Sequence, residues 1–526
     1  MKRNKILITL FLIFGSLTLH SCITDWLNVT PRDQMLNREM FSTETNINNV
    51  LNGIYRSMAA RGLYGENMTQ TFTEHLARFY WQYGSPTALD SDVNLWANVA
   101  WFEYGEAPVR GRIQTIWNDT YALIFRINAF IYNLKTVSDD VMMESRRHVL
   151  LGEAYALRAF LHFDMFRLFG PVNMTDAHTG LPYNRSHQVM PHPNLPADEF
   201  IHLVLEDLAT ALVLLEDDPI HTSGVNSNFG AITMDMTLTP EDIFSRFFRN
   251  RRMNYFAARA LEARVLLHAG RRHEAANAAQ MLIDQIYRTG IFRWEEARTD
   301  VQRSTIIRDR NFVFYREVLF GLDNIVLHTT WQSLFEGTRI GRTHAVSFSQ
   351  LRAVFGNFDG ALSEVRDIRA RQWTMSNVNP HGISGIIAPP DTHISTRFRR
   401  EDTERLRNFQ PLMRMSELYY ILAEVAILNG RSNYAAEAIN RVQSMRGLID
   451  LQLLDPATAT LAEVTARLEE EIYREFVGEG QIFFYLKRNN RSVIFDGNGG
   501  RTNLLLEFPS TERIYVLPLP DSETMI

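Results

Sequence analysis

The sequence predicts an all-α protein, in which tetratricopeptide-like helical hairpins form a scaffold that carries long irregular loop insertions. Three observations predict this fold class. Apolar residues recur at three- and four-residue steps in several long stretches, as they do on one face of a helix. Two helix pairs share one pattern of glycine and alanine, which indicates an internal repeat. The long segments around them lose the helical period and collect proline and glycine.

The amino-terminal residues have the layout of a lipoprotein signal peptide. Basic residues within the first five positions precede an apolar run from Ile6 to Leu19, which is short for a membrane span and ends just before Cys22. Cys22 is the only cysteine of the chain. We therefore expect it to carry acyl chains after residues 1–21 are removed. An ordinary secretory peptide, with Cys22 incidental, is the alternative.

Residues 22–45 are expected to form a tether and an extended lead-in, because Pro31 excludes a helix and no apolar period is present. Residues 46–526 then form a single domain, since no linker divides them. The chain of 526 residues is 45% hydrophobic, which is a globular composition. Its formal net charge of −6 argues against nucleic acid as a partner, and its single cysteine leaves no internal disulfide.

The first part of this domain contains four helical stretches. The third is apolar on nearly all sides, so we expect it in the middle of the structure, and it stops at the helix-breaking pair Gly170-Pro171. The other three are predicted from their apolar period. In chain order the four stretches are residues 46–55, Ile113–Leu134, Val149–Phe169 and Ala197–Leu215.

The repeat consists of two helix pairs. In each pair the first helix ends at a glycine, Gly270 or Gly430, and the second helix contains adjacent alanines. Small residues at these places let two antiparallel helices approach closely, as tetratricopeptide units do when they stack. Two unrelated hairpins are the alternative. The first helices are Tyr255–Ala269 and Ser416–Asn429, and the matched alanines are Ala263 with Ala423 and Ala275-Ala276 with Ala435-Ala436.

Residues 217–250 and 290–410 are predicted to be irregular insertions. They lose the helical period, and the second contains Pro389-Pro390. Long loops on a rigid scaffold often carry function. The last segment, Ile514 to Pro520, is predicted to be extended and not helical beyond Pro518.

Several segments, in the same order along the chain, resemble the SusD/RagB family of outer-membrane nutrient-uptake lipoproteins. The most specific runs from Gly152 through Arg158 to the stop at Gly170-Pro171. Two places depart from the family pattern, because Gln481 and Tyr485 stand where the family usually has Arg and Asp. The other matching segments are Cys22 with Asp25–Pro31, Leu51–Arg56, Trp117–Asn128, Val365–Arg369, Arg414–Glu424, Asn440–Val442, Glu479-Gly480 with Leu486–Arg488, and Leu517–Pro520.

The resemblance implies a mostly helical fold and a cell-surface lipoprotein that is anchored in the outer membrane and sits over a SusC-like TonB-dependent transporter. It implies capture of oligosaccharides, or of peptides as in RagB-like members. We expect a binding protein that is not an enzyme and has no cofactor. A surface glycan hydrolase, and a structural lid that binds nothing strongly, are the rival interpretations.

Residues 79–104 are rich in aromatic rings and polar side chains, the composition that a sugar-binding surface needs. The apolar face of a sugar ring lies on an aromatic ring, and its hydroxyls seek amide, carboxylate or guanidinium groups. The rings follow no helical stripe, so we predict a ligand platform, with burial in the interior as the alternative for each ring. The predicted ligand-binding residues are Trp81, Tyr83, Trp96, Trp101, Tyr104 and, in the loop after Ile325–Leu327, Trp331.

Two carboxylate patterns are weaker candidates for chemistry. Residues Asp90 to Asn94 begin like a calcium-binding loop but lack its glycine and distal glutamate, so a solvated loop is favoured. Glu475 and Glu479 are four residues apart, which would place both on one helix face, where a pair can do acid–base work. A scaffold or solvated role is favoured for them. The sequence contains no recognisable nucleophile motif or metal-ligand motif.

Overall fold

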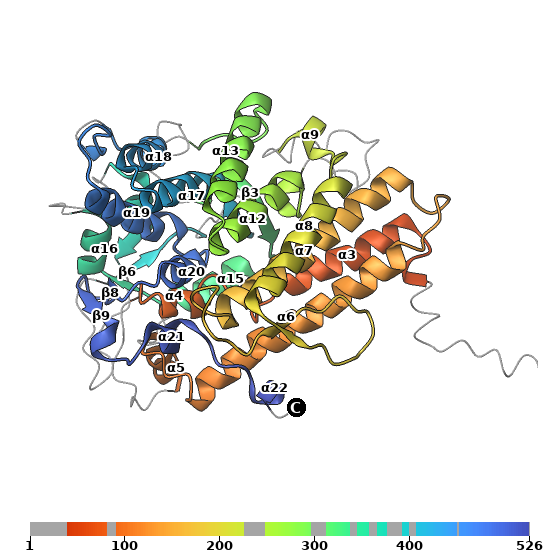
Figure 1. The fold of residues 1–526 in the computed structure, drawn as a ribbon, viewed down its shortest axis with the longest axis horizontal. Helices are drawn as coiled ribbons and strands as arrows, with labels where there is room; N and C mark the ends of the chain where they lie inside the picture. Colours follow the sequence, from red (N-terminus) through yellow and green to blue (C-terminus); the bar gives the residue numbers. More distant parts are fainter. Residues whose placement is uncertain are drawn as a thin grey trace, which may run out of the picture.

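The structure, a computed structural model, describes residues 39–80, 91–225, 248–295, 312–336, 344–356, 366–375, 392–398, 407–449 and 452–524. Helices dominate these residues, and the strands are short (Figure 1). The predicted signal peptide, Cys22 and most of the tether lie outside them. Among the described residues, no helix combines the length and the apolar character that a membrane span requires.

Four helices form one side of the molecule and confirm the first four predicted helices (Figure 1). α7 is buried along nearly its whole length from Val149 onward, as its uniformly apolar sequence predicts. α6 and α7 begin five or six residues earlier than predicted, because their first turns are mostly polar and exposed. The bounds are α3 Glu44–Met58, α6 Ala107–Leu134, α7 Glu144–Phe169 and α8 Ala197–Leu214.

Two helical hairpins form a second layer and confirm the predicted repeat. Ala263 and Ala275 in the first hairpin, and Ala423 and Ala435 in the second, have no exposed surface, so the small residues lie where the helices meet. α13 also packs against α17, which stacks the hairpins as in tetratricopeptide repeats. The first hairpin is α12 Tyr255–His268 with α13 Arg272–Thr289, and the second is α17 Met415–Leu428 with α18 Ser432–Met445.

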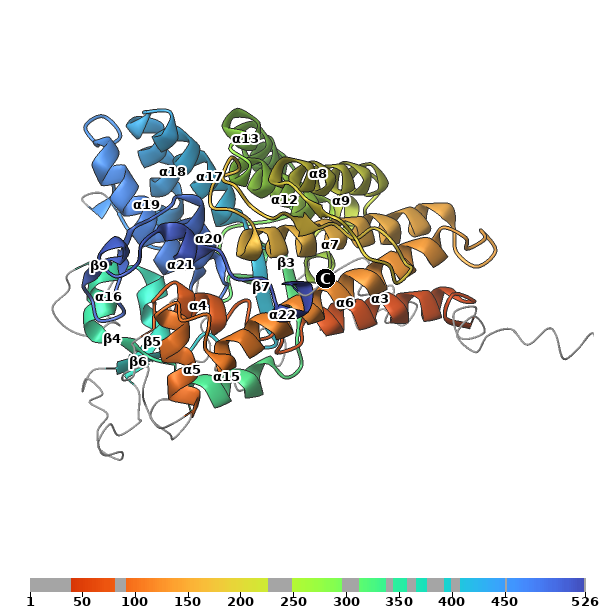
Figure 2. The ribbon, with the colours of Figure 1, turned by 60° about the horizontal axis from the view of Figure 1, so that its bottom comes forward.

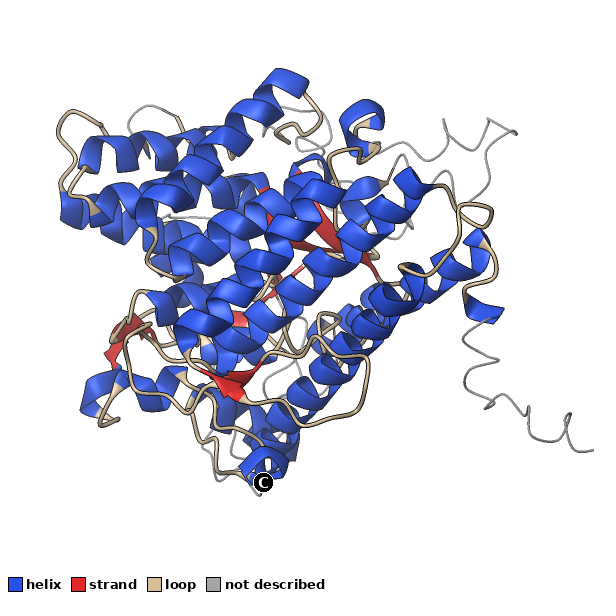
Figure 3. Cartoon of the chain, turned by 45° about the vertical axis from the view of Figure 1, so that its right-hand side comes forward, coloured by secondary structure: helices blue, strands red, loops and turns tan. Residues whose placement is uncertain are grey.

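The segment 290–410 contains regular elements that the sequence analysis missed. β3 pairs antiparallel with β7, the strand that leads into α17 (Figure 2), and a second sheet has the strand order β4-β6-β5. The strands are short pieces among the helices (Figure 3). The irregular prediction is wrong for these elements, which are too short to complete a readable period. Their bounds are β3 Val318–Asp323, α15 Leu327–Phe335, β4 Val346–Ser347, α16 Phe348–Phe355, β5 Trp373–Met375, β6 Thr392–Ser395 and β7 Phe409–Arg414.

Shorter elements connect these layers. Two further antiparallel strand pairs, β1 with β2 and β8 with β9, have two or three residues in each strand. The remaining helices and strands are α4 Phe72–Leu76, α5 Ser91–Ala100, β1 Leu181–Pro182, β2 Asn194–Leu195, α9 Ile220–Ser223, α19 Leu461–Phe476, α20 Gln481–Arg488, β8 Val493–Phe495, β9 Arg501–Asn503, α21 Thr511–Tyr515 and α22 Asp521–Thr524. The 3-10 turns are η2 Arg249–Arg251, η4 Tyr315–Glu317, η6 Ile368–Gln372 and η9 Leu504–Leu506.

The carboxyl-terminal segment is helical at both ends and extended between them. α21 ends at Tyr515 and α22 begins at Asp521, so only residues 516–520 confirm the predicted extended segment. A short helix does form beyond the prolines, contrary to the prediction. The Leu517 N–H donates to the Leu168 carbonyl at 3.1 Å, which ties the extended segment to the end of α7.

A buried ionic network joins the segment 290–410, called the insertion from here on, to the second hairpin. The Glu475 carboxylate, in the last turn of α19, accepts hydrogen bonds from Arg369 of η6 at 2.8 Å and from Arg414 of β7 at 2.5 Å. It also accepts one from Arg446, just after α18, at 2.6 Å. Arg446 in turn pairs with Glu317, which precedes β3, at 2.6 Å. All five side chains are buried, so five separate segments converge at one place.

The turn after α19 requires glycine at position 480. Gly480 has a φ of +72°, and a Cβ added there would lie 1.9 Å from the Met68 carbonyl oxygen. This close approach lets the N–H groups of Gly478 and Gly480 donate to the buried Glu74 carboxyl group, at 3.1 and 3.2 Å. The turn therefore docks onto α4, directly before the aromatic segment of the chain.

Gly480→Ala is expected to lower the free energy of unfolding by about 3–5 kcal/mol, because left-handed strain adds to overpacking against Met68. The matched control is Gly430→Ala, since Gly430 has the same φ of +72° but nothing within 4 Å of an added Cβ. We expect the control to lose about 1–2 kcal/mol, from strain alone. Urea unfolding measures both, and equal losses would contradict the close contact.

Candidate functional site

The aromatic segment, residues 79–104, follows α4 in the chain, contains α5 and precedes α6 (Figure 2). Trp81, Tyr83 and Asp90 lie outside the described residues. From Ser91 onward the predicted loop is helical, which puts the calcium-like pattern in the first turn of α5 and not in a loop. In the described part of the chain, no group of three His, Cys, Asp or Glu side chains is arranged to hold a metal ion.

Trp96 belongs to the core. Its ring stacks on the His75 ring of α4, with centroids 4.8 Å apart and an interplanar angle of 17°. The Arg112 guanidinium lies over the Trp96 ring at 5.5 Å from its centroid. Only 8% of the residue is exposed. A sugar could stack on Trp96 only by displacing one of these groups, so this arrangement does not present it as a platform residue.

A pair of neutral imidazoles packs against Trp96. His75 Nε2 and His344 Nδ1 share a hydrogen bond of 2.9 Å. Burial lowers the pKa of His75 well below its usual value and that of His344 to about 3, so neither ring is charged at pH 7. Because His344 belongs to the insertion, the pair holds α4 against that part of the chain.

Trp331 is also in the core, and it lies in α15 rather than in a loop. It is 1% exposed, and its ring is stacked on Phe335 with centroids 6.0 Å apart. The four-residue spacing of Leu327, Trp331 and Phe335 places all three on the buried face of the helix. Trp331 therefore offers no accessible ring face to a ligand, which corrects its predicted place in a loop platform.

Of the four predicted rings that the structure describes, Trp101 is the one that stays partly exposed. The Arg78 guanidinium lies 4.8 Å from its ring centroid. Arg78 is itself only 4% exposed, has a φ of +53°, and leaves its Nε and Nη1 without a hydrogen-bond partner. A strained backbone and an unsatisfied buried cation both cost free energy, and such features concentrate at functional sites. No sequence pattern marked Arg78.

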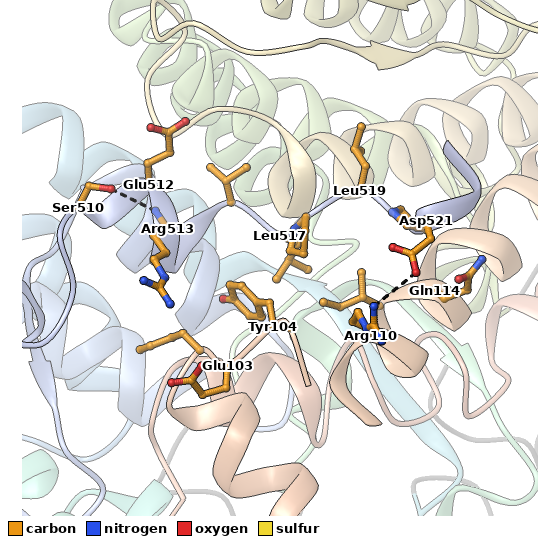
Figure 4. A pocket seen from close by; sticks show the side chains of 16 residues that line it. Glu103, Tyr104, Arg110, Gln114, Ser510, Glu512, Arg513, Leu517, Leu519 and Asp521 are labelled. Carbon is orange, nitrogen blue, oxygen red and sulfur yellow. Dashed lines mark hydrogen bonds and ion pairs between the residues drawn. The ribbon is translucent and has the colours of Figure 1, made fainter. Parts of the chain in front are cut away.

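Tyr104 lines a different place, a pocket of about 640 Å³ between the start of α6 and the carboxyl-terminal segment (Figure 4). Its hydroxyl donates to the Ile514 carbonyl, which holds the ring against α21. The residue is 8% exposed. Arg110, Arg513 and Pro518 also line the pocket. The sequence predicts Tyr104 as a ligand contact and the end of the chain as extended, but nothing in it indicates that the two meet.

The four predicted rings that the structure describes thus do not form one platform. Trp96 and Trp331 face the interior, Trp101 lies partly exposed beside Arg78, and Tyr104 belongs to the carboxyl-terminal pocket. The aromatic composition of the segment was informative, but it did not separate rings that support the surface from rings that form it.

Glu475 and Glu479 do not form an acid–base pair on a helix. α19 ends at Phe476, so Glu479 lies in the following turn, where it pairs with Arg414 at 3.0 Å. Burial opposes ionisation of Glu475, but the charges of the surrounding arginines outweigh it and hold its pKa well below the usual value. A buried carboxylate that is held ionised in this way serves the scaffold and is not poised for proton transfer.

Glu74 is a buried acid of the opposite kind. Burial raises its pKa to about 8, against the two glycine N–H donors, which lower it. Its Oε2 has no hydrogen-bond partner. At pH 7 the group is therefore mostly protonated, so folding takes up a proton at this carboxyl group between about pH 4.5 and 8.

Two family models match the chain. A SusD-like model with the description "Starch-binding associating with outer membrane" matches residues 25–267, and a model with the description "SusD family" matches residues 392–525. The chain belongs to the SusD/RagB family, as the ordered segments of its sequence predicted.

Curated relatives match shorter stretches. SusD-like protein P2 of Formosa agariphila is 26% identical over 219 residues, which are 41% of this chain and 39% of that protein. SusD-like protein P38 of the same organism is 35% identical over 95 residues, which are 18% of this chain and 17% of that protein. The chain therefore spans less than half the length of the curated relatives it matches.

Solved structures share the fold over nearly the whole chain. A SusD superfamily protein from Bacteroides thetaiotaomicron has a TM-score of 0.65 at 20% identity, and the match covers 92% of this chain and 98% of that one. A SusD-like carbohydrate binding protein from Bacteroides vulgatus has a TM-score of 0.61 at 15% identity, with 92% and 96% covered. At these identities the similarity establishes the fold alone.

Glu475→Gln is expected to lower the free energy of unfolding by about 3–5 kcal/mol, because it leaves buried arginines without their counter-charge. Urea unfolding measures the loss. The control is Glu274→Gln, which removes an exposed partner of Arg271 and should leave the transition unchanged. A variant that kept wild-type stability but lost hydrolysis of a glycan would support the enzyme interpretation instead.

The stability of the wild type should fall as pH rises from about 4.5 to about 8. In this window the unfolded chain has released the Glu74 proton and the folded chain still holds it, so rising pH favours unfolding until the folded group also ionises. Glu74→Gln cannot ionise, and we expect it to remove this slope. Urea unfolding at several pH values measures it, with Glu216→Gln as a surface control. Equal slopes in wild type and Glu74→Gln would refute the assignment.

Proposed function

We propose that this chain is a lipoprotein of the outer membrane that captures oligosaccharides at the cell surface and passes them to a SusC-like TonB-dependent transporter. Acyl chains on Cys22 would hold it at the membrane, since two chains give stable attachment where one gives only marginal binding. The protein itself would do no chemistry on the sugar. Membership of a family whose model is described by starch binding and association with the outer membrane supports this proposal.

The observation that carries the carbohydrate assignment is the partly exposed Trp101, whose ring centroid lies 4.8 Å from the Arg78 guanidinium carbon. A sugar has an apolar ring face and hydroxyls around its edge. Trp101 offers an aromatic surface for the face, and beside it the buried Nε and Nη1 of Arg78 have no hydrogen-bond acceptor among the described residues. Both properties are needed in one place, and among the predicted rings this pair supplies them together.

Neighbouring residues extend the proposed surface. Trp81 and Tyr83 follow Arg78 within five positions of the sequence, so we propose them as further ligand contacts. Trp96 supports the surface from the interior through its stacking on His75. A few rings and hydrogen bonds give modest affinity, which suits a protein that must release what it captures.

Trp101→Ala is expected to weaken oligosaccharide binding at least tenfold, about 1.4 kcal/mol, because it removes the stacking surface. Since the ring is partly exposed, the variant should remain folded, which circular dichroism checks. Affinity is measured by titration calorimetry with oligosaccharides selected on a glycan array. The matched control is Trp294→Ala, another partly exposed tryptophan, which packs beside Tyr419 and should bind as the wild type does.

Binding of a peptide library with no response on the glycan array would overturn the carbohydrate assignment and favour a RagB-like peptide binder. The anchor has its own test, since radiolabelled palmitate should enter the wild type and not Cys22→Ala. The partner is tested by co-purification with any TonB-dependent transporter that a neighbouring gene encodes.

A further inference from the structure

The pocket that contains Tyr104 is not lined by Trp101 or Arg78, and it has the size of a small-molecule site. Its volume is about 640 Å³, within the range of roughly 300–1,000 Å³ that ligand pockets occupy. In Figure 4 the Tyr104 ring lies between Arg513 and Arg110, and Leu517 of the carboxyl-terminal segment lies across from it. The pocket is thus made by parts of the chain that lie far apart in sequence.

Hydrogen bonds fix the walls of this pocket. The Tyr104 hydroxyl is bound to the Ile514 carbonyl, and the Leu517 N–H is bound to the Leu168 carbonyl. The buried Lys487 amine donates to the same Leu168 carbonyl at 3.2 Å. A pocket whose walls are already held loses little conformational freedom when it binds a ligand.

The turn that leads into the pocket is strained. Phe102, which lines the pocket, has a φ of +57°, a left-handed conformation that is unfavourable for a residue with a bulky side chain. Its ring packs edge-on against Phe508, with centroids 5.6 Å apart, and this contact helps to hold the conformation. Strain of this kind persists where the surroundings enforce it, and it clusters at binding sites. Here it turns the chain after α5 so that Tyr104 reaches the pocket.

The polar side chains of the pocket include acidic and basic groups, and several of them have unused hydrogen-bonding capacity. In the described part of the chain, no hydrogen bond or ion pair engages the side chains of Glu103, Glu512 or Arg513. Arg110 pairs with Asp521 at 3.6 Å, in an exposed geometry that contributes little. The pocket therefore combines apolar surface with hydrogen-bond donors and acceptors that a ligand can use.

We propose that this carboxyl-terminal pocket is a second carbohydrate site, which binds a neutral sugar unit. The inference rests on the proposed function and adds a place of binding that is distinct from Trp101. Pro518 and the small exposed part of Tyr104 supply apolar surface at the edge of a sugar ring, Arg513 donates to its hydroxyls, and Glu103 and Glu512 accept from them.

The mixed charges select a neutral ligand. An acidic sugar would meet the carboxylates of Glu103, Glu512 and Asp521, and a cationic ligand would meet Arg110 and Arg513. Sugar hydroxyls both donate and accept hydrogen bonds, so a neutral oligosaccharide can use the groups of both signs. The pocket thus favours uncharged glycans over uronates, amino sugars with free amines, and sulfated chains.

Gly105→Trp blocks the pocket with the least disturbance to the fold. Gly105 lines the pocket, and nothing lies within 4 Å of a Cβ added to it, so a side chain can leave the backbone there without a clash. The matched control is Gly53→Trp on α3, where an added Cβ is equally free. The probes are maltoheptaose, cellohexaose, xylohexaose and mannohexaose, with hexagalacturonate as the charged comparison, titrated calorimetrically into the whole mature chain.

We expect at least one neutral probe to bind at two sites in the wild type and in Gly53→Trp, but at one site in Gly105→Trp. Arg513→Gln should weaken that second site at least fivefold. Unchanged binding in Gly105→Trp, with loss in Trp101→Ala, would overturn the pocket and leave the proposed function standing. Loss in Gly105→Trp with retention in Trp101→Ala would support the pocket and remove the Trp101 site. No neutral binding, or a preference for hexagalacturonate, would overturn the pocket.

Discussion

The Glu475 carboxylate organises the second half of the molecule. It forms ion pairs with three arginines that lie far apart in the sequence, Arg369, Arg414 and Arg446. None of the four side chains is more than 2% exposed. A buried ion costs several kcal/mol unless it is paired and hydrogen-bonded, so these segments can be buried only together. The network therefore acts less as a source of stability than as a constraint on which segments meet.

This constraint reaches the candidate site through the β3–β7 pair. Arg414 ends β7, and Glu317, which is bound to Arg446, immediately precedes β3, so the network fixes one end of both strands. At the other end, the Asn324 amide donates to the Ala59 carbonyl at 3.0 Å, just beyond α3. The insertion is thus held between the second hairpin and the first helix layer. Its His344 ring contacts His75 of α4 and Trp96 of α5.

Aromatic rings serve two physical roles on this scaffold. Trp96 and Trp331 lose their ring faces to neighbours in the core, and they hold the insertion and α5 in place. Trp101 and Tyr104 instead lie beside groups that have unused hydrogen-bonding capacity among the described residues, Arg78 Nε and Nη1 in one case and the Arg513 guanidinium in the other. Recognition of a sugar needs apolar surface and free hydrogen-bonding groups together, so the polar neighbours distinguish the two roles better than the rings do.

The sequence by itself determined the long helices, the stacked hairpins and the family. A helix of several turns repeats its apolar stripe often enough to be recognised, and the alanines beyond Gly270 and Gly430 mark where hairpin helices touch. Only the tertiary structure decided the short strands, the burial of Trp331 and the pocket at Tyr104. Those features depend on contacts between distant residues, such as Tyr104 with Ile514, 410 positions away, and local periodicity carries no record of them. The lipid anchor at Cys22 stays a prediction.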